Sequence, residues 1–169
     1  MPFDWQSATD AEVDLQYSPS QFSKRPLDEY LHEYHRLSAP WAGKNLVIPG
    51  PPLLVYIHGG YWQRLSAADS LFNADDAQRL GFSLHATEYT LAPHATVEQI
   101  VQECIDDVSS VLDRAQAPRV VVAGCSAGAH LATMVAMSPR LTGRVGMVAL
   151  LSGDRKSTRL NSSHIPLSR

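Results

Sequence analysis

The stretch Val120-Val121-Val122-Ala123-Gly124-Cys125-Ser126-Ala127-Gly128 decides the fold. Its apolar, mostly β-branched start indicates a short buried strand, and the composition of residues 127–137 favours a helix. A serine between two glycines, on the turn from strand to helix, is typical of a nucleophile held on a strained backbone. We expect the turn to lift the Ser126 hydroxyl to the carboxyl end of the sheet, where the Ala127 N–H meets a developing oxyanion. A plain glycine-rich turn remains the alternative on this pattern alone.

A second element lies earlier in the chain. Residues 53–57 form a continuous apolar run, typical of a strand buried on both faces, and lead into His58-Gly59-Gly60-Tyr61-Trp62. Consecutive glycines after a central strand allow N–H groups to turn toward a bound carbonyl, so Gly59 and Gly60 are candidate oxyanion-hole donors. We interpret His58 as structural support for this loop, with general base as the alternative. Tyr61 and Trp62 are substrate-pocket candidates or, equally, packing residues that fix the loop.

These motifs carry a family resemblance. Residues 58–62, Tyr89-Thr90-Leu91-Ala92-Pro93 and residues 124–132 resemble the α/β-hydrolase superfamily. Within it they are most similar to the kynurenine formamidase (arylformamidase) group, close to the esterases related to hormone-sensitive lipase. Residues 17–20 also resemble the N-terminal region of bacterial formamidase-like hydrolases. The resemblance covers roughly residues 4–153 and departs at Cys125, where the family often has histidine.

The resemblance implies an α/β-hydrolase fold, with a mostly parallel sheet and helices on both faces. It also implies a serine hydrolase in which Ser126 attacks an aryl formamide such as N-formylkynurenine, a step of tryptophan catabolism. A short-chain carboxylesterase is the alternative, and a non-catalytic binding module that keeps the fold is an alternative of another class. We expect a small-molecule amide or ester as the partner, and no cofactor.

The end of the chain does not provide the expected acid and base. In this fold the triad follows the chain order Ser, Asp or Glu, His, yet residues 127–153 contain no Asp or Glu and one histidine, His130. We expect His130 to pack or hydrogen-bond locally. From Asp154 the sequence is polar, basic and without periodicity, and it resembles translated sequencing adapter. A natural basic tail that binds nucleic acid or a membrane surface is the alternative.

Two domain assignments follow from this change of composition. We expect residues 1–153 to be the N-terminal part of an α/β-hydrolase domain whose C-terminal portion is missing, and residues 154–169 to be a non-native tail. The triad Asp and His would then be absent and this chain inactive. The strand predicted at 145–151, internal in the family fold, would become an exposed edge through which chains associate with one another.

The rest of the chain predicts alternating helices and strands. Thr96 and Gln99 form a predicted capping box at the start of the clearest helix. The predicted helices cover residues 26–37, 67–80 and 96–115, and the further predicted strands cover residues 44–48 and 82–89.

Length and composition exclude several classes. The 169 residues suit one domain. A net charge of −3 does not show the excess of basic residues that is typical of nucleic-acid-binding domains. No signal peptide and no apolar run of membrane-spanning length is evident. Two cysteines indicate no disulfide framework, so a cytoplasmic location is expected. His32 and His35 lack a third ligand, so no metal site is expected.

Overall fold

Helices and strands alternate along the chain in the order that the sequence predicts. The structure, a computed structural model, describes residues 26–44 and 52–151. Its strands are β1 (Leu53–Ile57), β2 (Ser83–Thr87), β3 (Val120–Cys125) and β4 (Val145–Leu151). Its α-helices are α2 (Leu27–Ser38), α3 (Ala74–Arg79), α4 (Val97–Arg114) and α5 (Ala127–Met137). Short 3₁₀ turns are η2 (Ala39–Trp41), η3 (Ala68–Asn73) and η4 (Pro139–Leu141).

The described strands form one parallel sheet in the order β2-β1-β3-β4. Because all of them run the same way, the ends of β1 and β3 meet at one edge, with Ile57 opposite Gly124. This register brings the loop after β1 beside the turn after β3. The two motifs that the sequence singles out therefore lie together.

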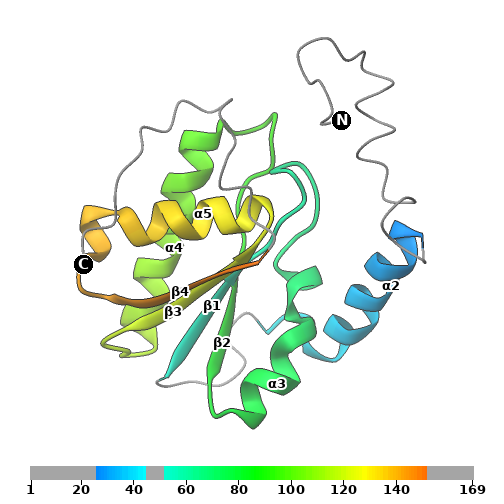
Figure 1. The fold of residues 1–169 in the computed structure, drawn as a ribbon, viewed down its shortest axis with the longest axis horizontal. Coiled ribbons are helices and arrows are strands. Elements are labelled where there is room, and N and C mark those ends of the chain that lie inside the picture. The colour runs from blue at the N-terminus through cyan, green and yellow to red at the C-terminus, as the bar shows by residue number, and fades with distance from the viewer. Residues whose placement is uncertain (1–25, 45–51, 152–169) are drawn as a thin grey trace, which may run out of the picture.

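Helices cover both faces of the sheet, as Figure 1 shows. Helices α4 and α5 pack on one face, where the apolar side chains of β1 and β3 form the larger core cluster. The segment η3–α3 packs on the other face against Tyr56, Leu84 and Ala86, and α2 lies outside it against η3. Burial on both faces explains why β1 and β3 read as continuous apolar runs.

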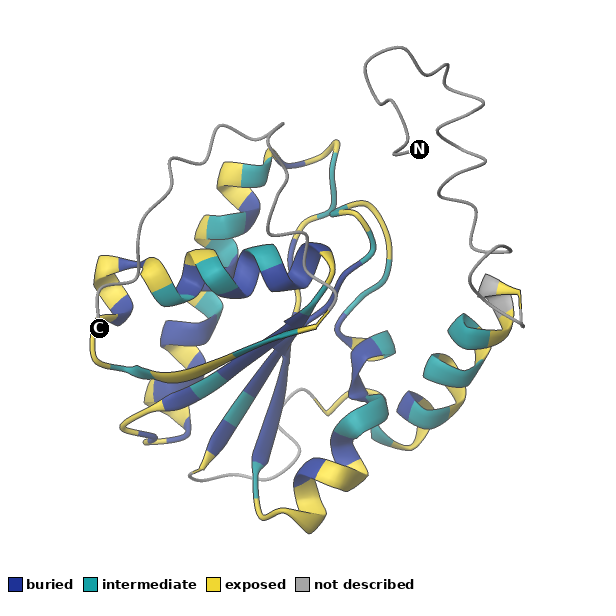
Figure 2. Cartoon of the chain, in the orientation of Figure 1, coloured by how far each residue is buried: buried dark blue, intermediate teal, exposed yellow. Residues whose placement is uncertain are grey.

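Strand β4 differs from the other strands in its exposure. Figure 2 shows it mostly exposed or intermediate beside the dark blue central strands. Met147 is 63% and Leu151 51% exposed. Among the described residues β4 is an edge of the sheet, with β2 at the opposite edge.

Most of the predicted elements are confirmed within two residues at each end. The side chain of Thr96 accepts from the Gln99 N–H and the Gln99 side chain accepts from the Thr96 N–H, so the capping box of α4 is formed. The predicted helix at 67–80 is only partly correct, because its first half is the 3₁₀ segment η3. There Ser70 Oγ donates to the Ser66 carbonyl and Ser66 Oγ to Asp69, and such local bonds compete with regular helix.

Two predictions fall outside the described residues. Except for Lys44, the strand predicted at 44–48 lies outside the described residues. The whole tail assigned to residues 154–169 lies outside them as well.

Candidate active site

Ser126 occupies the turn between β3 and α5. Its backbone has φ 54° and ψ −119°, a left-handed conformation that is costly for a residue with a Cβ atom. Its side chain is exposed at the carboxyl end of the sheet. This strained strand–turn–helix geometry is the one that presents a nucleophilic serine.

Three backbone features hold the serine in this conformation. The Ser126 N–H donates to the carbonyl of Leu151, the last residue of β4, at 2.9 Å. The Ser126 carbonyl accepts from the N–H of Ala129 at 2.9 Å, which closes the first turn of α5. A Cβ at Gly128 would lie 2.1 Å from the Ile57 carbonyl oxygen, so only glycine lets α5 approach the end of β1 this closely.

The glycine loop after β1 lies directly against the serine turn. A Cβ at Gly59 would lie 2.6 Å from the Cys125 carbonyl oxygen and 3.3 Å from Ser126 Cβ. The Gln63 and Arg64 N–H groups both donate to the Gly60 carbonyl at 3.0 Å and fold the loop back. Within the described part of the chain, the N–H groups of Gly59, Gly60 and Ala127 donate to no other residue. Three N–H groups without a partner among the described residues, two in the loop and one at the start of α5, thus adjoin the serine.

His58 is buried beneath this loop. Its Nδ1 lies 2.9 Å from the Gly59 carbonyl oxygen, which identifies Nδ1 as the protonated nitrogen because a carbonyl only accepts. Its Nε2 lies 3.8 Å from a Glu88 carboxylate oxygen and has no hydrogen bond. Burial lowers the pKa of His58, so the ring is neutral at pH 7. These contacts fit the predicted supporting role, and no hydrogen bond joins His58 to Ser126.

A small hollow opens beside Ser126. Its volume is about 90 Å³, and the loop residues His58, Gly59 and Gly60 line it together with the serine. The rest of its wall is largely aromatic and apolar, contributed by Tyr34, Tyr56, Leu65, Phe72 and Cys125 with Asp69 and Ser70.

The aromatic wall joins three elements. Tyr34 of α2 stacks on Phe72 of η3 with ring centroids 4.6 Å apart, and Phe72 meets Tyr56 of β1 edge-on at 5.7 Å. The sequence analysis assigned none of these aromatic residues to a site. Their approach depends on tertiary packing and leaves no local signal.

The residues that the sequence offered as pocket candidates lie elsewhere. Tyr61 is 75% exposed, and neither Tyr61 nor Trp62 lines the hollow at Ser126. Trp62 packs on the core, and its ring meets that of His130 edge-on at 5.7 Å. Trp62 thus makes packing contacts, and its role as a pocket residue stays a prediction. His130 packs locally, and burial lowers its pKa.

The described residues place no base in hydrogen-bond contact with Ser126. Ser126 Oγ hydrogen-bonds to none of them. The described residues form three histidine–carboxylate pairs. His85 and Asp107, 2.7 Å apart, lie between β2 and α4, away from the hollow. The pairs His35–Asp69 (2.9 Å) and His58–Glu88 (3.8 Å) each contribute one residue to the lining of the hollow, but none of their members is hydrogen-bonded to Ser126. The predicted absence of the triad acid and base in this chain stays a prediction.

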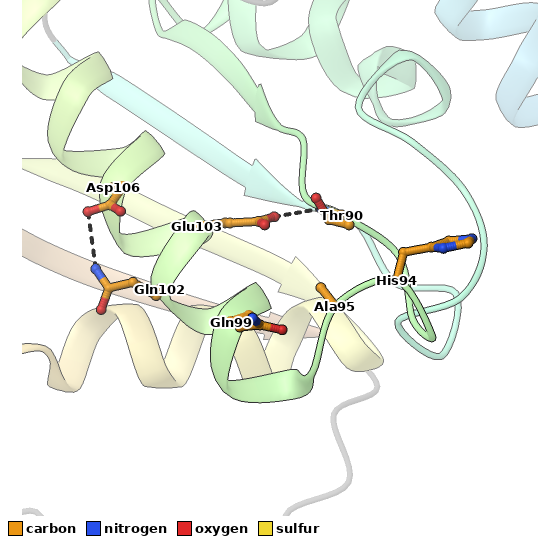
Figure 3. A pocket seen from close by; sticks show the side chains of 7 residues that line it. All are labelled: Thr90, His94, Ala95, Gln99, Gln102, Glu103 and Asp106. Atoms are coloured by element: carbon orange, nitrogen blue, oxygen red, sulfur yellow. Dashed lines mark hydrogen bonds between the residues drawn. The ribbon is translucent and has the colours of Figure 1, made fainter.

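A larger hollow of about 350 Å³ lies along α4 (Figure 3). Two pairs of its polar groups bind one another. Glu103 accepts from the Thr90 N–H at 2.6 Å, and Gln102 donates to Asp106 at 3.1 Å.

Metal and membrane features were searched over the same described residues. Residues 26–44 and 52–151 hold no group of three His, Cys, Asp or Glu residues placed to bind a metal ion. None of the helices in those ranges has the length and apolar character needed to cross a membrane. Cys104 and Cys125 are both free.

The fold and the serine turn define a class of protein. A family model described as alpha/beta hydrolase fold matches residues 54–164, and the chain belongs to this family. The match continues into residues 154–164, which the sequence assigns to a non-native tail, so that assignment stays a prediction.

Particular relatives are formamidases and esterases. The chain is 31% identical to the kynurenine formamidase of Danio rerio over 78% of this chain and 55% of that protein. It spans about half the length of the curated vertebrate relatives that it matches. The resemblance read from the motifs is thereby confirmed.

Solved structures agree with this family. A bacterial heroin esterase is 33% identical, with a TM-score of 0.55 over 60% of this chain and 35% of that one. A hormone-sensitive lipase from a metagenome library has a TM-score of 0.58 over 87% of this chain and 58% of that one, at 22% identity. The second likeness supports the fold alone.

Proposed function

We propose that the protein is a serine hydrolase of amide or ester bonds, and in its complete form an arylformamidase. The observation that carries this proposal is the strained Ser126 turn packed against the Gly59–Gly60 loop, with unpaired N–H groups on both. The similarity to the kynurenine formamidase of Danio rerio supports the formamidase assignment.

In the proposed reaction, Ser126 Oγ attacks the carbonyl carbon of the substrate. The negative charge that develops on the carbonyl oxygen is stabilised by the N–H groups of Gly59, Gly60 and Ala127. A histidine takes the serine proton and gives it to the leaving amine or alcohol as the acyl C–N or C–O bond breaks, and an Asp orients that histidine. Water then hydrolyses the acyl group from Ser126. The histidine and the Asp would both come from sequence that this chain lacks.

The hollow beside Ser126 supports a small acyl group. A dry cavity that holds benzene measures about 150 Å³, whereas this one measures about 90 Å³. A formyl or acetyl group is small enough for that space. The aryl part of the substrate would lie outside the hollow, on the leaving-group side.

A short-chain carboxylesterase is the second candidate. The 33% identity to a bacterial heroin esterase favours it, and a small acyl pocket serves acetyl esters equally well. We also propose a cytoplasmic location, which the two free cysteines support.

The test measures hydrolysis of N-formylkynurenine and p-nitrophenyl acetate by the complete protein and by this 169-residue chain. We expect the complete protein to prefer N-formylkynurenine and to lose turnover of both substrates in Ser126→Ala. Loss of a triad histidine costs a factor on the order of 10⁶ in kcat, so this chain should show no more than trace acylation. Turnover that survives in Ser126→Ala would overturn the proposal, and a preference for the ester would favour the second candidate.

A further inference from the structure

We propose that Tyr89 is a positioning residue of the oxyanion hole, and that its hydroxyl sets the direction of the Gly59 and Gly60 N–H groups. This inference rests on the proposed function of the Ser126 site. Tyr89 follows β2 and lies beneath the loop after β1, without lining the hollow at Ser126. It therefore acts through the loop.

The Tyr89 hydroxyl contacts the loop at two carbonyl oxygens. It lies 3.1 Å from the His58 oxygen and 3.2 Å from the Gly59 oxygen, close enough to share its proton between them. The side chain is 4% exposed, so water does not compete for these bonds. Burial also raises the pKa of Tyr89, which keeps the hydroxyl protonated as a donor at neutral pH.

The two carbonyls belong to the peptide groups that carry the proposed oxyanion donors. A trans peptide is planar, and its C=O and N–H bonds point in opposite directions. Fixing the His58 carbonyl therefore fixes the Gly59 N–H, and fixing the Gly59 carbonyl fixes the Gly60 N–H. Tyr89 holds both peptide planes from the side opposite to the one on which the substrate oxygen would lie.

The loop needs such support because glycine does not restrict its own peptide planes. Gly60 has φ +91°, a conformation that glycine adopts readily because it has no side chain to limit backbone rotation. The His58 ring provides a second contact on the Gly59 carbonyl through Nδ1. It stacks on the Tyr89 ring with centroids 4.1 Å apart and an interplanar angle of 11°. Tyr89 thus holds the loop directly by its hydroxyl and indirectly by its ring.

The test substitutes Tyr89→Phe, which keeps the ring and its stacking and removes only the hydroxyl. In ¹⁵N-labelled 169-residue chain, residual dipolar couplings report the direction of each N–H bond. We expect the couplings of Gly59 and Gly60 to change while those of β1 and α5 stay constant. In the complete protein we expect kcat to fall about tenfold or more with KM nearly unchanged, because the loss concerns the transition state.

Thr133→Val is the matched control. The Thr133 hydroxyl donates to the Ala129 carbonyl at 2.9 Å, so this change also removes one hydroxyl–carbonyl bond, but from a peptide without an oxyanion donor. It should leave the couplings of Gly59 and Gly60 and the value of kcat unchanged. Should Tyr89→Phe fail to fold, the parent chain decides: a hydroxyl proton shared by two buried carbonyls exchanges slowly with water, and a free one exchanges fast.

Distinct outcomes overturn the two proposals. Unchanged couplings in Tyr89→Phe, fast exchange of the hydroxyl proton, or an unchanged kcat in a protein that Ser126→Ala inactivates would overturn the role of Tyr89. Activity that persists in Ser126→Ala would overturn the proposed function while the couplings still test what Tyr89 does to the loop.

Discussion

At the scale of single residues, the site depends on how closely two backbones approach. Gly59 lies against the serine turn with no room for a side chain, since an added Cβ would meet the Cys125 carbonyl oxygen at 2.6 Å. Neither backbone can yield without moving a proposed oxyanion donor or Ser126, the proposed nucleophile. The site geometry therefore requires glycine at position 59, because even the methyl group of alanine would not fit.

Gly59→Ala should be destabilising as well as inactivating. We expect the free energy of unfolding to fall by about 1–3 kcal/mol, the usual cost of forcing an extra methyl into a packed site. Chemical denaturation of this chain measures it, and kcat of the complete protein should fall with it. Gly146→Ala is the control, because its Cβ would meet its nearest neighbour, Arg119, at an ordinary 3.6 Å. Equal stability of the two variants would contradict this account of the contact.

At the scale of elements, the sequence predicted much of the sheet and little of the pocket. Strands β1 and β3 are apolar throughout because both of their faces are covered. The capping box of Thr96 and Gln99 marks the start of α4 in the sequence. The aromatic wall at Ser126 was not predictable in this way. Tyr34 and Phe72 come from α2 and η3, and only their packing against one another makes them neighbours.

Strand β2 shows the same limit. Its residues alternate between polar and apolar, which for a strand normally indicates one wet face, yet all five are buried. His85 is accommodated because its Nε2 meets the Asp107 carboxylate of α4 at 2.7 Å, while its Nδ1 has no partner. A partner on another element made this histidine a core residue, and no local pattern reveals it.

Asp107 should therefore contribute more to the stability of the fold than its neighbour Asp106. Asp107→Ala would leave the buried His85 ring without any hydrogen bond, which costs about 1–3 kcal/mol of unfolding free energy. Asp106 is exposed and pairs with Arg140 and Gln102, so Asp106→Ala should cost much less. Urea denaturation at pH 7 compares them. A larger loss in Asp106→Ala would show that the His85 pair does not link β2 to α4.

At the scale of the whole molecule, the described sheet ends in an apolar strand. Met147, Val148 and Leu151 of β4 are exposed, and β4 carries no charged residue and no proline to oppose pairing with another strand. Strand β2, at the other edge, is buried along its length. Of the two edge strands of the described sheet, only β4 thus presents exposed apolar side chains to a neighbouring molecule.

We predict that the 169-residue chain self-associates through β4 and that Val148→Lys reduces this association. A lysine on an edge strand opposes the addition of a further strand because its charge must stay in water. Sedimentation velocity over a range of protein concentrations measures the effect. Leu80→Lys, which replaces an exposed apolar residue away from β4, is the control. A stable monomer of the parent chain at high concentration would contradict the prediction.

The hydrogen bond from the Ser126 N–H to the Leu151 carbonyl connects the serine turn to the end of strand β4. Strand ends at the margin of a sheet open locally far more often than central strands do. Each time the last residue of β4 frays, the serine turn loses one of the contacts that maintain its strained backbone. Among the described residues β4 is an edge strand, so we expect the conformation of Ser126, the proposed nucleophile, to depend in part on how often the end of β4 opens. A neighbour that covers β4 should keep the Ser126 turn in its strained conformation for a larger fraction of the time.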